Sequence, residues 1–249
     1  MRGSAGVFWA ALVAGLITAG AARADHYIYS PIVEEGVLEL ETRLHRTVDS
    51  AADKNNAQTH IFELGYGVTS WWHTALVGVL DKHPQGSLSY NATGWENIFQ
   101  LTQQGEYWLD AGLYLEYARG WRGQPDEFET KILLEKAVQP LVLTANLIFN
   151  KQAGQNADKG IGFEYGVRAK WPWTRGLQFG VEAFGESGRI GDFAAVSQQH
   201  HAVGPVLLGR FNIPHIPGVF GYQVGYLFGV TSASAKGEMK GVLEYEIPF

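Results

Sequence analysis

The sequence predicts an all-β protein, a transmembrane antiparallel β-barrel of about twelve strands. First, segments of about 9–11 residues with alternating apolar and polar side chains recur along the chain, which is the pattern of barrel strands. Second, the connections between these segments alternate between shorter and longer ones. Third, residues 239–249 alternate in the same way and end on the aromatic residue Phe249. A strand with one apolar and one charged face needs a different environment on each side.

Residues 1–24 have the features of a secretory signal peptide. A short basic start precedes an apolar core at residues 7–20, and Ala22-Arg23-Ala24 forms a cleavage site before Asp25. We therefore expect cleavage after Ala24, export from the cytoplasm and one barrel domain over residues 25–249. The chain has 0 cysteines, which excludes disulfides, and a net charge of −6, which argues against nucleic acid as a partner.

The clearest alternation covers residues 37–45, where leucines occupy one face and charged side chains occupy the other. Further strands are expected near residues 60–68, 72–80, 94–103, 107–118, 127–138, 140–150, 160–170, 177–186, 202–211, 219–230 and 238–249. The segments at 72–80 and 202–211 alternate poorly, so the pattern also allows ten or fourteen strands.

The connections predict which end of the barrel faces which side of the membrane. An even number of strands places both termini in the periplasm, with short periplasmic turns and longer extracellular loops. The shorter set comprises residues 68–71, 103–106, 139–140, 171–176 and 212–218. The longer set comprises residues 47–58, 81–92, 119–126, 151–159, 187–201 and 231–237.

In a membrane barrel the apolar face of each strand meets lipid and the polar face lines the lumen. The alternation assigns to the lumen a set of mostly acidic side chains: Glu39, Glu41, Arg43, Glu63, Asp110, Glu116, Glu164, Arg168, Glu182 and Glu244. One interpretation is a polar channel that prefers cations, because acidic side chains attract them. The other is a closed interior whose charges pair with one another, since an uncompensated charge in a dry lumen is costly.

The last strand needs a partner, because a bare apolar edge invites aggregation. Its expected partner is the strand at residues 37–45, which would close the barrel. We expect Leu243, Tyr245 and Phe249 to serve closure and assembly, and Phe249 resembles the C-terminal signal read by the barrel-assembly machinery. The partners predicted for the chain are the outer-membrane bilayer, this machinery and a small solute.

Two stretches carry a family resemblance. Residues 62–71 read Phe-Glu-Leu-Gly-Tyr-Gly-Val-Thr-Ser-Trp, and residues 37–41 read Val-Leu-Glu-Leu-Glu. Together with residues 162–168 and 179–185, they resemble the outer-membrane protein family associated with meta-pathway phenol degradation. The resemblance implies a barrel that transports small, often aromatic, compounds. It supplies no residue-level site.

The sequence gives little sign of catalysis. His200 and His201 lie in the longest outer loop, where a histidine pair could bind a metal ion, but no third ligand is identifiable. Ser197 with either histidine could supply a nucleophile and base, yet no nucleophile elbow is present. We therefore predict no catalytic residue, metal or cofactor. The expected function is a passive channel for small solutes; the alternatives are an outer-membrane hydrolase resembling a lipase or lipid A deacylase, and a structural or adhesive barrel with partner-binding loops.

Overall fold

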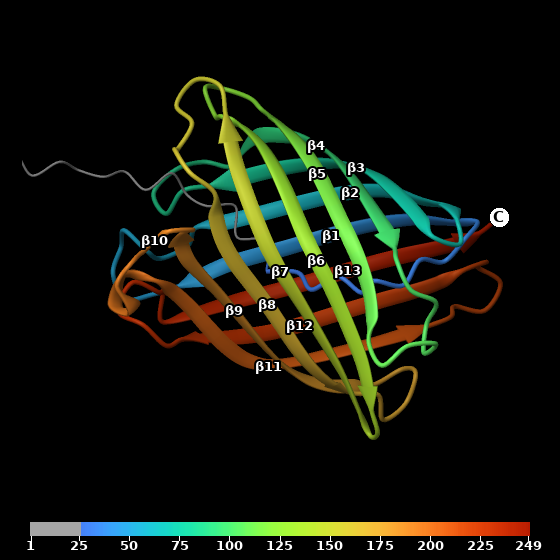
Figure 1. Ribbon diagram of the computed structural model, residues 1–249. Helices are drawn as coiled ribbons and strands as arrows, with labels where there is room; N and C mark the ends of the chain where they lie inside the picture. The colour runs from blue at the N-terminus through green and yellow to red at the C-terminus, as the bar shows by residue number, and fades with distance from the viewer. Residues whose placement is uncertain (1–25) are drawn as a thin grey trace, which may run out of the picture.

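The computed structural model describes residues 26–249, and the predicted signal peptide lies outside them. These residues form a closed antiparallel barrel of twelve long strands, so the predicted fold and strand number are confirmed (Figure 1). The strands are β1 (Val37–Val48), β2 (Gln58–Thr69), β3 (Trp72–Lys82), β4 (Ser89–Gln100), β5 (Asp110–Gly120), β6 (Asp126–Val138), β7 (Leu141–Ala153), β8 (Gly162–Trp171), β9 (Gln178–Arg189), β11 (His200–Phe211), β12 (Val219–Gly229) and β13 (Gly237–Pro248). A short strand, β10 (Asp192–Phe193), pairs with the end of β9. Within residues 26–249, no helix is long and apolar enough to span a membrane.

The barrel closes between its first and last strands, as predicted. β1 and β13 pair along their whole length, with Leu40 opposite Tyr245 and Leu44 opposite Gly241. Beside this seam, the Phe249 N–H donates to the Gly36 carbonyl over 2.7 Å. We call the end of the barrel where β1 begins and β13 ends the terminal end, and the opposite end the distal end. Both edges that an open sheet would expose are therefore paired.

The outer surface is apolar around the barrel. Leu243, Leu76 and Phe62 point outward and are about half exposed, at 51%, 60% and 54%. Aromatic side chains add exposed rings at both ends, including Trp71, Trp108, Trp171 and Trp173 at the terminal end and Tyr90, Trp121 and Phe193 at the distal end. An apolar band flanked by aromatic girdles is typical of a barrel embedded in lipid.

β3 and β11 alternate poorly because both of their faces are apolar. On β3, Val77 and Val79 point inward and pack with Ile61 and Ala92, while Leu76 points outward. On β11, Ala202 belongs to a second inner cluster with Ile28, Phe184 and Leu227. The interior is thus packed in places rather than lined throughout by polar groups, and this packing erases the period-2 signal.

One predicted connection is wrong. β4 ends at Gln100 and β5 begins at Asp110, so the terminal-end connection over residues 101–109 is longer than the distal loop at residues 121–125. A turn around Gly105, whose φ is +74°, is held by its N–H donating to Asp110 Oδ1 over 2.7 Å. Tyr107 and Trp108, which mimic the start of a strand in the sequence, are exposed on this turn.

Candidate functional site

The interior of the barrel is occupied by the chain's own N-terminal segment, residues 26–36. The segment ends at the terminal end, where the Gly36 N–H donates to the Gly67 carbonyl over 2.8 Å. A side chain at position 67 would overlap the Glu34 carbonyl, so this close approach requires glycine. Ile28 and Tyr29 are almost fully buried, at 1% and 4% exposure. An extended chain covers roughly 3.3 Å per residue, so the segment at residues 26–36 is long enough to run most of the way through a membrane barrel.

Asn146 on β7 holds the segment at its centre. The Tyr29 N–H donates to Asn146 Oδ1 over 2.8 Å, and Asn146 Nδ2 donates to the Tyr29 carbonyl over 2.9 Å. Asn146 itself is fully buried. Nearer the terminal end, the Val33 N–H donates to Gln100 Oε1 over 2.8 Å. The wall therefore supplies hydrogen bonds to backbone groups of the segment that water would otherwise satisfy.

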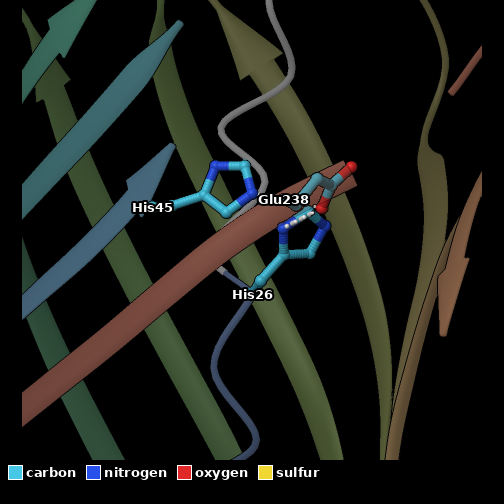
Figure 2. Close-up of side chains that lie close together, drawn as sticks. All are labelled: His26, His45 and Glu238. Atoms are coloured by element: carbon cyan, nitrogen blue, oxygen red, sulfur yellow. Dashed lines mark hydrogen bonds and ion pairs between the residues drawn. The ribbon is translucent and has the colours of Figure 1, made fainter. Parts of the chain in front are cut away.

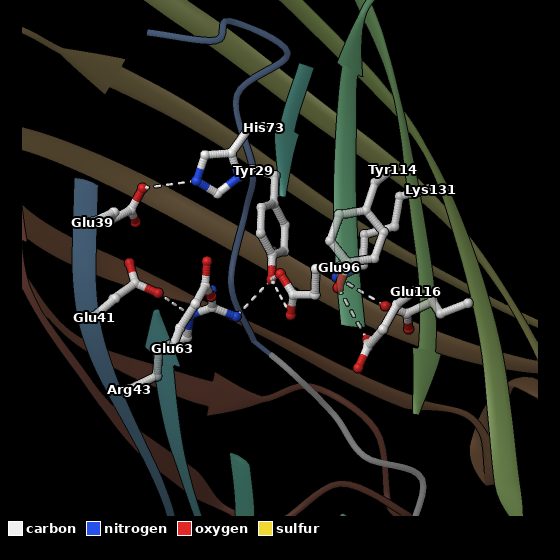
Figure 3. Close-up of polar contacts among 11 residues, drawn as sticks. Tyr29, Glu39, Glu41, Arg43, Glu63, His73, Glu96, Tyr114, Glu116 and Lys131 are labelled. Atoms are coloured by element: carbon white, nitrogen blue, oxygen red, sulfur yellow. Dashed lines mark hydrogen bonds and ion pairs between the residues drawn. The ribbon is translucent and has the colours of Figure 1, made fainter. Parts of the chain in front are cut away.

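A charged cluster surrounds the Tyr29 hydroxyl (Figure 3). Arg43 on β1 forms ion pairs with Glu41 and Glu63, and its Nη1 donates to the Tyr29 hydroxyl over 2.6 Å. The Tyr29 hydroxyl in turn lies 3.3 Å from Glu96 Oε2 on β4. The guanidinium group of Arg43 therefore compensates two buried carboxylates and also binds the segment in the lumen.

Lys131 on β6 closes this cluster on the side away from Arg43. Its Nζ lies 3.0 Å from Glu129 Oε1 and sits 4.2 Å and 4.4 Å from the ring centroids of Tyr29 and Tyr114. The Tyr114 hydroxyl donates to Glu116 Oε2 over 3.0 Å. Cation–π contacts stabilise a buried ammonium group, and here they add to its carboxylate partner.

A second charged cluster centres on Glu182, which is fully buried on β9. Lys240 Nζ lies 2.7 Å from Glu182 Oε2, and Arg168 Nη1 lies 3.5 Å from Glu182 Oε1. Gln223 Nε2 also donates to Glu182 Oε1, over 3.0 Å. Lys240 in addition donates to the His26 carbonyl, so this cluster too is connected to the N-terminal segment.

The other residues assigned to the lumen have more local contacts. Glu39 Oε2 lies 3.6 Å from His73 Nε2, and Asp110 holds the Gly105 turn at the terminal end. Glu164 accepts a hydrogen bond from Asn150 Nδ2 over 2.6 Å. Glu39, Glu41 and Glu244 have carboxylate oxygens within 4.8 Å of one another. The structure thus brings Glu39, Glu41, Arg43, Glu63 and Glu244 together, and places Arg168 and Glu182 in a separate cluster.

Several interior residues were absent from the predicted set. Tyr29 precedes the first strand, so no strand pattern assigns its side chain to a face. Glu96 lies in β4, where Ala92 and Gly94 share its inner face and dilute the polar signal. The one available signal was the run Tyr27-Ile28-Tyr29 just after the predicted cleavage site, because an exported chain seldom leaves such a run in water.

The distal loops are tied to one another. Lys54 Nζ in loop 49–57 donates to the carbonyls of Ser232 and Ala233 over 2.9 and 2.8 Å. Asp49 accepts hydrogen bonds from the N–H groups of Ala51 and Lys236, each over 2.8 Å. These backbone hydrogen bonds hold the pKa of the Asp49 carboxyl below its usual value, because they stabilise its charged form.

The geometry around Ser197 does not assemble a nucleophile and base. His201 Nε2 lies 2.7 Å from Gln199 Oε1, and its Nδ1 lies 3.1 Å from the Tyr165 hydroxyl. Among residues 26–249, no hydrogen bond joins the Ser197 hydroxyl to His200 or His201, and the Ser197 carbonyl accepts a hydrogen bond from the Ser232 hydroxyl over 2.8 Å. Within the described part of the chain, neither His200 nor His201 belongs to a group of three or more His, Asp or Glu side chains whose ligand atoms all lie within 4.8 Å of one another.

No protein-family model matches the chain, and no curated protein matches its sequence. The resemblance to the phenol-degradation family therefore stays a prediction. Among solved structures, the chain is similar to the NanC porin, with a TM-score of 0.53, 10% identity and coverage of 85% of this chain and 100% of that one. At this identity the likeness shows a shared porin-like barrel fold.

Two further structures align more loosely. LpxR from Salmonella typhimurium has a TM-score of 0.45 at 9% identity, covering 83% of this chain and 99% of that one. Pseudomonas aeruginosa OprD has a TM-score of 0.40 at 10% identity, covering 87% of this chain and 67% of that one.

Proposed function

We propose that this protein is an outer-membrane channel for small solutes, held closed by its N-terminal segment in the conformation described. The observation that carries the proposal is the combination of an apolar outer belt with a charged interior in one closed barrel. Such a barrel is stable only with lipid outside and polar groups or water inside. A signal peptide over residues 1–24 would deliver it past the inner membrane.

The interior charges favour small cations and neutral solutes. Acidic side chains outnumber basic ones in the interior. The carboxylates are those of Glu39, Glu41, Glu63, Glu96, Glu116, Glu164, Glu182, Glu238 and Glu244. The basic side chains are chiefly Arg43, Lys131, Arg168 and Lys240. Acidic walls attract cations and repel anions. The aromatic side chains of the interior and the family resemblance together favour aromatic compounds as the solute class.

Passage requires the N-terminal segment to move, because Ile28 and Tyr29 fill the lumen. The two hydrogen bonds between Asn146 and the Tyr29 backbone hold it in place. They contribute about 1–3 kcal/mol in total. Removing them should shift the balance between closed and open states by about 5- to 150-fold.

The test is the conductance of purified protein in planar bilayers. We expect wild type to open rarely and Asn146→Ala to open markedly more often in KCl. The matched control is Asn150→Ala, on the same strand and the same inner face but bonded to Glu164 rather than to the segment. If neither wild type nor Asn146→Ala conducts, with or without phenol-sized solutes, the channel function is wrong. The hydrolase alternative has less support, because no hydrogen bond joins the Ser197 hydroxyl to His200 or His201 within residues 26–249.

A further inference from the structure

Three potential metal ligands converge from separate parts of the chain inside the distal half of the barrel (Figure 2). His26 belongs to the N-terminal segment, His45 to β1 and Glu238 to β13. On the closing seam, His45 is opposite Lys240 and Glu238 is opposite Thr47, so His45 and Glu238 are diagonal neighbours on the inner face. The N-terminal segment places His26 next to this pair.

The ligand atoms have the spacing of a coordination site. Glu238 Oε2 lies 3.1 Å from His26 Nδ1 and 3.1 Å from His45 Nε2. The three ligand atoms all lie within 4.8 Å of one another. Bonds of about 2.0–2.2 Å to a tetrahedral Zn²⁺ place neighbouring ligand atoms roughly 3.3 Å apart. A small adjustment of the side chains would therefore centre one ion among them.

The surroundings suit a cation despite a nearby ammonium group. Lys240 shares the inner face, but its charge is compensated by Glu182 at 2.7 Å and its Nζ also binds the His26 carbonyl. Glu186 and His200 are close enough to act electrostatically on Glu238. The side chains of His26, His45 and Glu238 are only 11%, 15% and 10% exposed, so the site is shielded without being sealed.

The donor set selects the ion. Two imidazoles and one carboxylate suit Zn²⁺ and other divalent transition metals, whereas Ca²⁺ and Mg²⁺ need a shell of oxygen ligands. Three protein ligands leave a fourth position for water, as in open zinc sites.

We propose that His26, His45 and Glu238 bind one divalent transition-metal ion, with Zn²⁺ the best-matched, and that this ion ties the N-terminal segment to the closing seam of the barrel. One ion would coordinate the segment and two wall strands at once. Metal binding then stabilises the occupied lumen by mass action, because displacing the segment removes one ligand.

The test is calorimetric titration of Zn²⁺ into detergent-solubilised protein purified from membranes and treated with chelator. We expect one ion per chain. The substitutions His26→Gln, His45→Gln and Glu238→Gln should each weaken Zn²⁺ binding at least about 10- to 100-fold. A loss of that size follows even when only a residue that hydrogen-bonds to a metal ligand is changed, so loss of a ligand itself should cost at least as much. His60→Gln is the matched control, because His60 lies on the neighbouring strand β2 beside Gln58 and outside this cluster. Unchanged heat-modifiable gel mobility would show that each variant remains folded.

Hydrogen exchange locates the effect within the chain. Zn²⁺ should slow amide exchange in residues 26–33 of wild type and of His60→Gln, but not of His45→Gln. Absence of Zn²⁺ binding would overturn the proposal, as would binding that survives in all three ligand variants. Binding lost only in a His200→Ala, His201→Ala double variant would assign the metal to the start of β11 instead. None of these measurements depends on conductance, so they test the metal site independently of the proposed channel function.

Discussion

Arg43 shows how a single side chain makes this interior possible. Glu41 and Glu63 are buried at 4% and 6% exposure, and both form ion pairs with it. Desolvating a carboxylate costs several kcal/mol unless a cation and hydrogen bonds compensate it. The planar guanidinium group can donate hydrogen bonds to both carboxylates and to the Tyr29 hydroxyl at once. A lysine has one ammonium nitrogen on a flexible stem and cannot reproduce this arrangement of donors.

Replacing Arg43 by methionine should therefore destabilise the barrel strongly. Losing one partner of a buried charge network costs about 3–5 kcal/mol, because the remaining carboxylates are left uncompensated. The measurement is urea unfolding in lipid vesicles, followed by the shift in gel mobility. Arg46→Met is the control, since Arg46 lies on the same strand with its side chain exposed. Equal unfolding midpoints for the two variants would contradict the role assigned to Arg43.

At the scale of elements, the seam between β1 and β13 determines whether the barrel closes. The two strands pair from Val37 opposite Pro248 to Val48 opposite Gly237. Tyr245 stacks on Phe220 of β12 with ring centroids 4.4 Å apart, and its hydroxyl donates to the Pro217 carbonyl over 2.6 Å. Phe249 is 81% exposed, so it contributes little packing to the folded barrel. Its predicted role is recognition by the assembly machinery.

Leu243→Arg should impair barrel formation, because Leu243 faces outward in the middle of β13. An arginine on the lipid face costs about 2–4 kcal/mol near the bilayer midplane and much less near the interfaces. The measurement is the amount of heat-modifiable protein in isolated outer membranes. Leu88→Arg, in the exposed distal loop at residues 83–88, is the control and should assemble normally.

Deleting Phe249 separates assembly from stability. We expect less barrel in cell membranes but near-normal refolding in detergent, because the folded structure leaves this ring exposed. A variant that assembles normally in cells would show that Phe249 carries no assembly signal. The measurement compares heat-modifiable protein from membranes with that from refolding of the same variant.

At the scale of the whole molecule, the excess of acidic groups in the lumen should set ion selectivity once the segment is displaced. Glu39, Glu41 and Glu244 gather on the inner face near the terminal end. A group of carboxylates at a channel mouth concentrates cations there. This property belongs to the barrel as a whole, because β1 and β13 supply the group from opposite ends of the sequence.

The reversal potential of the Asn146→Ala channel in a KCl gradient should therefore have the sign of a cation-selective pore. Adding Glu39→Gln and Glu244→Gln should reduce the preference for K⁺ over Cl⁻. Adding Glu106→Gln instead should leave it unchanged, because Glu106 lies on the exposed turn at residues 101–109. Anion selectivity in the Asn146→Ala channel would contradict an acidic conduction path.

The sequence alone predicted the barrel, a strand number of about twelve and the pairing of β1 with β13, and the structure fixed the number at twelve long strands. These follow from local rules: side chains alternate at every second residue, and short turns join neighbouring strands. The same alternation brought Glu41, Arg43 and Glu63 to one face, so part of the charged cluster was predictable. It failed on β3 and β11, where apolar packing inside the barrel hides the period.

Only the tertiary structure decided what fills the lumen. The contact between Tyr29 and Asn146 joins residues 117 positions apart, and it exists only because the closed barrel surrounds the N-terminal segment. The convergence of His26, His45 and Glu238 depends on the same closure, together with the path of that segment. Strand periodicity records which face a side chain occupies, but it contains no information about a segment that crosses the interior without pairing to any strand.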